Sequence, residues 1–312
     1  MLSRTANSLY WLARYVERMD FVARMLEVGL RMGSISSTSR DSEWTSTLIA
    51  TGCEPGFRAT GRAPTADGVI PYLARDPGNP SSILSCITTA RANARAVRTA
   101  LTKDMWDAVN ETWLEARALT DADFTQTGIA RVLDWAKRRA LQFNGAYKNT
   151  MLRSDAYYFT QLGTYVERAD DTARILDVKY HVLLPSHEPV GGALDYHHWT
   201  ALLRAVSALR AYHWVYKDRI KPWNVAELLV LRPEMPRSMR ASFDQIVVNL
   251  DLLTGEMNAR GGEPHRLASE LHARLKYARI DDIFAAGLHE VLSDYIDRTA
   301  RLDEEIRRFF LM

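Results

Sequence analysis

Apolar residues along the chain recur every three or four positions, which is the period of one face of an α-helix. Near the start of the chain, the pattern runs through Leu12, Tyr15, Val16, Met19, Val22, Ala23, Leu26 and Leu30. Similar patterns begin near Ser82, Met105, Phe124, Ala156, Tyr196, Val225, Ser238, Glu263 and Gly287. Because no run of alternating β-branched residues competes with them, the sequence predicts an all-α fold.

Clusters of Gly and Pro predict the loops between these helices. They lie at 33–41, 52–67, 76–80, 185–192 and 260–264. The segment 124–184 is almost continuously helical in pattern, with one break at 144–155. Since no flexible linker divides the middle of the chain, we expect one compact body, a multi-helix bundle, rather than two independent domains.

A motif near the start of the chain recurs at an offset of 150 residues. The run Tyr-Val-Glu-Arg at 15–18 reappears at 165–168, and 10 of 20 positions are identical between 9–28 and 159–178. Three further matches follow in the same order: Trp44-Thr45 with Trp199-Thr200; Val69, Leu73, Pro77, Pro80 and Ser82 with Val225, Leu229, Pro233, Pro236 and Ser238; and Gly128, Ile129, Val132 and Leu133 with Gly287, Leu288, Val291 and Leu292. Four collinear matches predict an internal duplication, with pseudo-symmetric halves at 1–150 and 151–312 that pack face to face.

Composition is that of an ordinary globular protein. The 312 residues are 47% hydrophobic and 25% charged, which excludes intrinsic disorder. Two cysteines, Cys53 and Cys86, are too few for a disulfide framework. With no apolar leader or long apolar run, we expect a cytoplasmic protein without a membrane partner. A net charge of +2 gives no electrostatic reason to expect a nucleic-acid partner.

Charged residues form a stripe opposite the apolar face of the first predicted helix, and the matching helix repeats it. The stripes are Glu17, Asp20, Arg24 and Glu27 in the first copy, and Glu167, Asp170, Arg174 and Asp177 in the second. In each stripe an Asp precedes an Arg by four residues, which is the favourable order for an ion pair within a helix. Arg18 and Arg168 lie at the edge of the apolar face, from where a guanidinium can reach a carboxylate.

Three interpretations of the stripes remain open. The stripes form a structural network of Arg and carboxylates that fixes the docking of the two halves, or they line a functional cleft, or they are plain solvated surface with weak ion pairs. Their repetition at equivalent positions favours the first two over the third.

Four stretches together resemble the alpha-E domain family across the whole chain. They are 8–18 (SLYWLARYVER), 158–180 around Glu167-Arg168, 79–83 followed by 90–98 and Trp106, and 235–238 (Met-Pro-Arg-Ser). Two departures from the family pattern are visible. Ala92 stands where the family usually carries Glu, and Met19 and Phe21 replace the more polar pattern kept at Ala169 and Asp171. The second departure indicates that the first stripe is the less functional one.

The resemblance implies an all-α protein encoded beside, or fused to, a circularly permuted ATP-grasp ligase. A transglutaminase-like peptidase and a proteasome-related hydrolase often accompany the pair, and the systems look like machinery for making and processing peptide or amide bonds. The resemblance assigns no catalytic residue to the alpha-E domain itself. It implies that ATP binds to the ligase, and we expect this chain to need no cofactor of its own.

We therefore expect a helical component that offers a cleft for a peptide or amino-acid substrate, or that takes part in acyl transfer. In that hypothesis Glu167, Asp170 and Arg174 orient or deprotonate an amine, and Glu17, Asp20 and Arg24 form the mirrored set. Two alternatives remain: a non-catalytic scaffold whose stripes only dock the halves, and an independent enzyme.

A second group of residues is a weaker candidate for substrate binding, alongside Arg18 and Arg168. Arg91, Arg95 and Arg98 are spaced for one face of one helix and suit a phosphate or carboxylate, but a surface stripe paired with acids fits the same spacing. Asn93, a poor residue for a helix interior, is expected to bond a neighbouring group.

The histidines do not follow a metal-ligand spacing. His197-His198, His213, His265 and His272 lack a His-x-x-x-His or Glu-x-x-His motif with a second acidic helix, so we expect no metal. The sequence also has no glycine-rich phosphate loop and no G-x-S-x-G motif.

Overall fold

The computed structural model describes residues 3–33, 40–182, 193–256 and 262–311. Within these ranges the chain forms fifteen α-helices and a few short 3-10 or π turns, without a strand. The predicted all-α class is therefore confirmed. No helix among the described residues is long and apolar enough to cross a membrane.

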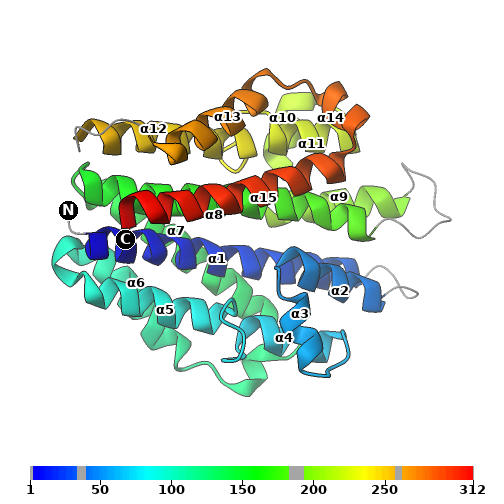
Figure 1. The fold of residues 1–312 in the computed structure, drawn as a ribbon. Helices are drawn as coiled ribbons and strands as arrows, with labels where there is room; N and C mark the ends of the chain where they lie inside the picture. Colours follow the sequence, from blue (N-terminus) through cyan, green and yellow to red (C-terminus); the bar gives the residue numbers. More distant parts are fainter. Residues whose placement is uncertain (1–2, 34–39, 183–192, 257–261, 312) are drawn as a thin grey trace.

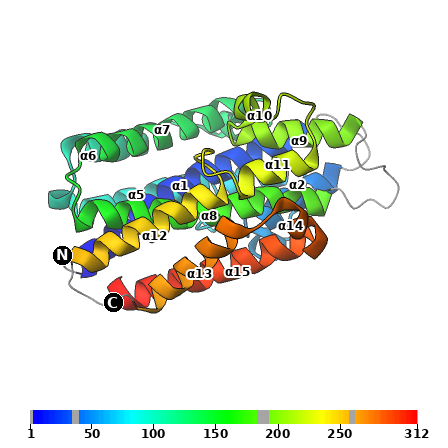
Figure 2. The same ribbon diagram turned by 90° about the horizontal axis from the view of Figure 1, so that it is seen from above.

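Two long helices, α1 (Ser3–Gly33) and α8 (Asp155–Val182), lie side by side at the centre of the molecule (Figures 1 and 2). Gly163 of α8 permits their close approach, because a Cβ at this position would lie 2.3 Å from the backbone oxygen of Tyr10. Leu9, Leu12 and Leu162 are fully buried in this part of the core. The other helices are arranged around this central pair.

Two helices pack directly on each central helix, and a third packs across those two. On α1 lie α5 (Ile83–Ala96) and α7 (Ile129–Thr150), with α6 (Lys103–Ala116) across both of them. On α8 lie α12 (Met239–Glu256) and α15 (Leu288–Ile306), with α13 (Glu263–Tyr277) across both of them. The two sets lie on opposite sides of the central pair in Figure 1.

Shorter helices complete each side. Both α2 (Arg40–Ala50) and α9 (Ala193–Ala205) contact both central helices. The remaining elements are α3 (Glu54–Ala59), α4 (Ala66–Ala74), α10 (Leu209–Tyr216), α11 (Pro222–Val230), α14 (Ile280–Ala286), η1 (Arg98–Ala100), η2 (Asp121–Phe124) and η3 (Arg307–Leu311). The last turn buries Phe310 and Leu311, as an apolar C-terminal turn should.

Several predicted boundaries were wrong. The break at 144–155 shrinks to 151–154, because α7 continues through Gly145 to bury Phe143 and Tyr147 on one face. That burial outweighs the helix penalty of about 1 kcal/mol for a glycine. The predicted loop at 52–67 contains α3, in which Pro55 occupies the first turn and Phe57 is buried. The predicted loop 185–192, most of 33–41, and positions 260–261 of the predicted loop 260–264 lie outside the described residues. The described part of that last loop is shorter than predicted, because α13 begins at Glu263.

Two serines begin matching helices. The hydroxyl of Ser82 accepts a hydrogen bond from the backbone N–H of Ser85 and donates one to the carbonyl of Asp76. The hydroxyl of Ser238 accepts from the N–H of Ala241 and donates to the carbonyl of Arg232. The turns that precede α5 and α12 are therefore built alike, with Ser81 and Arg237 immediately before the capping serines.

Candidate functional site between the two central helices

The two Glu-Arg pairs of the sequence meet across the interface between α1 and α8. Arg168 donates from Nε and Nη2 to the two carboxylate oxygens of Glu17, at 2.8 and 2.9 Å. Arg18 donates in the same way to Glu167, at 2.6 and 3.1 Å. Each pair is bidentate, which is the strong geometry for a guanidinium and a carboxylate.

Both glutamates are buried, at 1% and 3% exposure. Burial alone would raise the pKa of Glu17, but the positive charges of Arg168 and Arg237 outweigh it and lower the pKa to about 2. Burial alone would likewise raise the pKa of Glu167, but the positive charges of Arg18 and Arg14 outweigh it and lower the pKa to about 2. Both carboxylates are therefore ionised at neutral pH and held by arginines.

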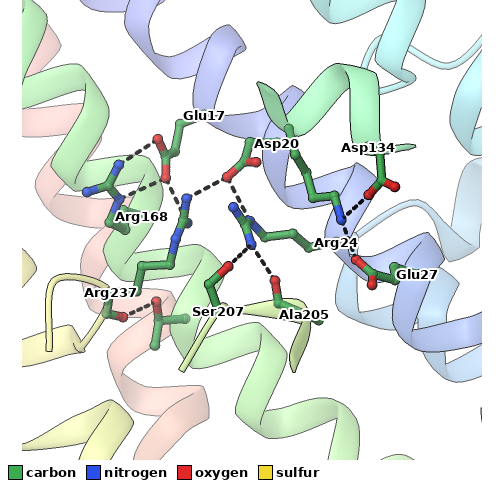
Figure 3. A network of polar contacts seen from close by, with 11 residues as sticks. Glu17, Asp20, Arg24, Glu27, Asp134, Arg168, Ala205, Ser207 and Arg237 are labelled. Atoms are coloured by element: carbon green, nitrogen blue, oxygen red, sulfur yellow. Dashed lines mark hydrogen bonds and ion pairs between the residues drawn. The ribbon is translucent and has the colours of Figure 1, made fainter. Parts of the chain in front are cut away.

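Around Glu17 the structure forms a first charge cluster, composed of Glu17, Asp20, Arg24, Arg168 and Arg237 (Figure 3). Arg237, from the turn before α12, donates to Oε1 of Glu17 at 3.1 Å and to Oδ2 of Asp20 at 2.6 Å. The same oxygen of Asp20 accepts from Nε of Arg24 at 2.8 Å. Arg237 thus bridges two carboxylates of another helix.

The first charge cluster is mostly buried, and its most exposed side chain is that of Arg237, at 16%. The side chains of Asp20 and Arg24 are 1% and 4% exposed. Arg24 also donates to the backbone carbonyl of Ala205, the last residue of α9, and to the hydroxyl of Ser207 just beyond it. The hydroxyl of Thr172 holds the turn in place by donating to the carbonyl of Arg237 at 2.8 Å.

Around Glu167 lies a second charge cluster, composed of Arg14, Arg18, Glu167, Asp170 and Arg174. Arg14 donates from Nε to Oε2 of Glu167 at 2.6 Å and also pairs with Asp303 of α15, which accepts from Tyr10 as well. Arg174 donates from Nε to Oδ2 of Asp170 at 2.7 Å.

Solvent reaches part of the second charge cluster. The side chains of Asp170 and Arg174 are 20% and 28% exposed, and that of Arg18 is 23% exposed. A Cβ added at Gly52 would lie 3.8 Å from Nη1 of Arg174, and the φ of +66° at Gly52 suits glycine. The cluster therefore borders the turn between α2 and α3.

Asp171 adds a third carboxyl group beside the second charge cluster. It is 5% exposed, and its Oδ2 has no hydrogen-bond partner among the described residues. Burial, followed by the negative charges of Glu167 and Asp170, raises its pKa well above the usual value. In the first half the corresponding residue is Phe21, which carries no charge.

The outer ends of both stripes turn toward other helices. Glu27 pairs with Arg31 and with Lys137 of α7, and Asp177 accepts from Nδ1 of His289 in α15 at 2.6 Å. The carboxylates at these ends therefore join neither charge cluster, and the six central stripe residues remain the candidates.

The weaker candidates lie away from both clusters. Arg91 stacks on Trp113 of α6, with its guanidinium carbon 3.9 Å from the ring centre, and Asn93 donates to the backbone oxygen of Thr89. Arg95 is exposed. The prediction that Arg98 shares their helix was wrong, because α5 ends at Ala96 and Arg98 lies in η1.

Sequence reasoning missed four members of the network: Tyr10, Arg14, Asp303 and Arg237. Arg14 and Arg237 lie in stretches that carried the family resemblance. No rule of helical spacing, however, predicts that Arg237 contacts Asp20, which lies 217 positions earlier in the chain. The available signal was the mismatch between Arg237 and Ser81 at corresponding positions of matching turns.

Among the described residues, no group of three or more His, Cys, Asp or Glu side chains is arranged to hold a metal ion. The arginines instead supply the positive charge that balances the buried carboxylates. The second charge cluster has the chemistry to bind charged groups, because some of its charged side chains reach solvent.

Comparison with known proteins identifies the family. The model of the Alpha-E family, described as a predicted alpha-helical domain with a conserved ER motif, matches residues 1–311. The chain therefore belongs to the Alpha-E family. The Glu-Arg dipeptide occurs twice in the sequence, at 17–18 and 167–168, and both copies form the crossed pairs described above.

Curated relatives are themselves uncharacterised. The chain is similar to the uncharacterized protein Mb2597 of Mycobacterium bovis and to the uncharacterized proteins MT2643 and Rv2567 of Mycobacterium tuberculosis, at 21% identity over 314 residues. The match covers 94% of this chain and 35% of each relative, so the chain spans about a third of their length. No solved structure matches the chain.

Proposed function

We propose that this protein is the helical component of a system that forms peptide or amide bonds. In this proposal it holds the acceptor or substrate at the second charge cluster, and a circularly permuted ATP-grasp ligase supplies the ATP-dependent chemistry. The observation that carries the proposal is the partial exposure of Asp170 and Arg174 beside a fully ionised, buried Glu167. Family membership and the extra length of the relatives support a partner protein.

The residues have different roles in this proposal. Glu167 has a pKa of about 2 and is held by two arginines, so it is a poor base and acts as a positioning residue for Arg18. Asp170 is the acceptor for an amine proton, and Arg174 binds a carboxylate or acyl phosphate while it orients Asp170. Glu17, Asp20 and Arg24 form a matched set with a structural role.

We further propose that the chain arose by duplication of a helical segment, with halves at 1–150 and 151–312 packed as one body. The matched packing of α5 and α7 on α1 with α6 across them, and of α12 and α15 on α8 with α13 across them, supports this origin. So does the reciprocity of the crossed pairs, in which each helix supplies one Glu and one Arg.

Two further parts of the proposal concern the setting. We propose that a transglutaminase-like peptidase is a second partner, which would process the products. We place the system in the cytoplasm, because Cys53 and Cys86 are both free thiols, as is common where disulfides are kept reduced.

A non-catalytic scaffold is the second candidate. This candidate is favoured because Glu17 and Glu167 are buried and fully paired with arginines. A network that only holds α1 and α8 together requires no more than that. In that case the charge clusters hold the two central helices together, and the partner acts without any group from this chain.

Reconstitution with the neighbouring ligase separates the two candidates. Ligation is measured with and without this chain, and then with Arg174→Ala and its matched control Arg24→Ala, each normalised to folded protein. The proposal expects turnover to fall about tenfold or more with Arg174→Ala only. Unchanged turnover with a folded Arg174→Ala protein would overturn the site and favour the scaffold.

A further inference from the structure

Each charge cluster contains three arginines and two carboxylates, but the third arginine is placed differently in the two. In the second cluster it is Arg14 of α1, which donates to Oε2 of Glu167 and pairs with Asp303. Arg237 bridges Oε1 of Glu17 and Oδ2 of Asp20 from the turn before α12. The corresponding residue in the turn before α5 is Ser81, whose side chain carries no charge. The turns are matched by their capping serines, so the difference lies in one side chain.

The corresponding carboxylate oxygens of the second cluster are less occupied. Oε1 of Glu167 accepts from Nε of Arg18, and Oδ2 of Asp170 accepts from Nε of Arg174. In the first cluster, each equivalent oxygen accepts the same bond from its own Arg and a second bond from Arg237. A carboxylate oxygen has two acceptor sites, so each oxygen of the second cluster can take one more donor.

Access to solvent and an unpartnered carboxyl oxygen favour a cation from solution. Asp170 and Arg174 are partly exposed, whereas Asp20 and Arg24 are not. Asp171 lies one helical turn from Glu167 and one from Arg174, is 95% buried, and has an oxygen without a partner among the described residues. A buried carboxyl group of this kind is stabilised in its ionised form by a nearby positive charge.

The turn containing Ser81 borders this region. The N–H of Ser81 donates to Oδ1 of Asn79 at 3.0 Å, and the thiol of Cys53 lies 3.7 Å from the same oxygen. Cys53 follows Gly52, which faces Nη1 of Arg174. A longer side chain at position 81 therefore starts close to the second charge cluster.

We propose that the second charge cluster binds a guanidinium or primary ammonium group of a ligand, which bridges Glu167 and Asp170 as Arg237 bridges Glu17 and Asp20. The first cluster is thus an internal copy of the ligand-bound state. The inference rests on the proposed function only in identifying this cation with the acceptor of the ligation. A guanidinium binds more tightly than an ammonium, because its donors form a planar fork that reaches two carboxylates.

Calorimetry on the isolated chain tests binding without the ligase. The probes are N-acetyl-arginine amide for the guanidinium, glycinamide for the ammonium, and neutral N-acetyl-glutamine amide as the control. We expect one site for at least one of the cationic probes and none for the neutral one, with affinity that falls as salt rises. Failure of both cations to bind, or equal binding of the neutral probe, overturns the inference.

Three variants locate the site. Ser81→Arg supplies the missing guanidinium from the chain itself, so it should weaken probe binding about tenfold or more. Asp170→Asn should weaken binding similarly, and its matched control Asp20→Asn should bind as the wild type does. If the Ser81→Arg protein does not fold, the comparison of probe binding to Asp170→Asn and Asp20→Asn tests the site on its own.

Undiminished binding to folded Asp170→Asn protein would place the site elsewhere and overturn the inference. Because ligation is not involved, loss of the ligase function with intact cation binding would count against the proposed function alone.

Discussion

The two charge clusters contain the same residue types around α1 and α8, yet the Asp-Arg pair is buried in one and partly exposed in the other. Both have a crossed Glu-Arg pair and an Asp-Arg pair four residues apart. They differ in their third arginine. In the first cluster it is Arg237 from the turn before α12, whereas the matching turn carries Ser81 and the third arginine of the second cluster is Arg14 of α1. Among the described residues, the first cluster therefore has an arginine that bridges its two carboxylates, and the second has none.

The largest expected effect concerns the crossed pairs. Arg168→Met leaves the carboxylate of Glu17 buried with Arg237 as its remaining close partner, so we expect a loss of about 3–5 kcal/mol in the free energy of unfolding. Arg18→Met should cost less, because the side chain of Arg18 is 23% exposed and that of Arg168 is 9% exposed, while one arginine still pairs with the glutamate in each variant. Urea denaturation of both variants measures the difference, and equal losses would contradict it.

Acid should weaken the protein through the same glutamates. The pKa of Glu17 and of Glu167 is about 2 in the folded protein, below the value near 4.3 of a free Glu. Their contribution is therefore complete above about pH 4.5 and is lost as the pH falls toward 2, by up to about 3 kcal/mol each.

Urea denaturation between pH 6 and about pH 2.5 measures this loss, with Glu17→Gln and Glu167→Gln for comparison. Each variant should be less stable than the wild type at pH 6 and should lose less stability on acidification. Parallel pH profiles for the variants and the wild type would count against the ion pairs as the cause.

The two Asp-Arg pairs should also differ, by a smaller amount, in how much they contribute to stability. Arg24→Ala removes a buried guanidinium from Asp20 and from the carbonyl of Ala205, and should cost about 2–4 kcal/mol. Arg174→Ala removes a partly exposed pair and should cost about 1 kcal/mol or less. Thermal denaturation of the two proteins should rank them in that order, and the reverse order would refute the contrast.

The smallest predicted effect is a gain in stability. Asp171 has a raised pKa, so its contribution to stability is complete below the free Asp value of about 3.9 and declines as the pH rises through the folded value. Asp171→Asn should therefore raise the free energy of unfolding at pH 8 and raise it less near pH 4. If the variant is less stable than the wild type at pH 8, a positive charge or a donor in the protein must stabilise the ionised Asp171, and the prediction is contradicted.

Local pattern predicted the helical class and the residues that meet at the centre. Periodicity located the central helices, and the repeat of Glu17-Arg18 at 167–168 indicated facing charges. The sequence could not predict that Asp20 is buried and Asp170 partly exposed, because their exposure depends on turns that lie far away in the chain. Arg98 was misplaced for a local reason, since the helix ends two residues before it.

The partners from distant elements required the structure. Arg237 and Asp303 reach α1 across 217 and 289 positions, and no helical period relates residues so far apart. The comparison of Ser81 with Arg237 becomes informative only once both turns are seen to begin matching helices.

The most direct test of the account compares Asp20→Asn with Asp170→Asn, measuring both the free energy of unfolding and ligase turnover per folded molecule. The account predicts that Asp20→Asn lowers stability and leaves turnover at the wild-type level, whereas Asp170→Asn lowers turnover and changes stability little. Turnover that is equally insensitive to both substitutions, or a loss confined to Asp20→Asn, would contradict the division of roles between the two clusters.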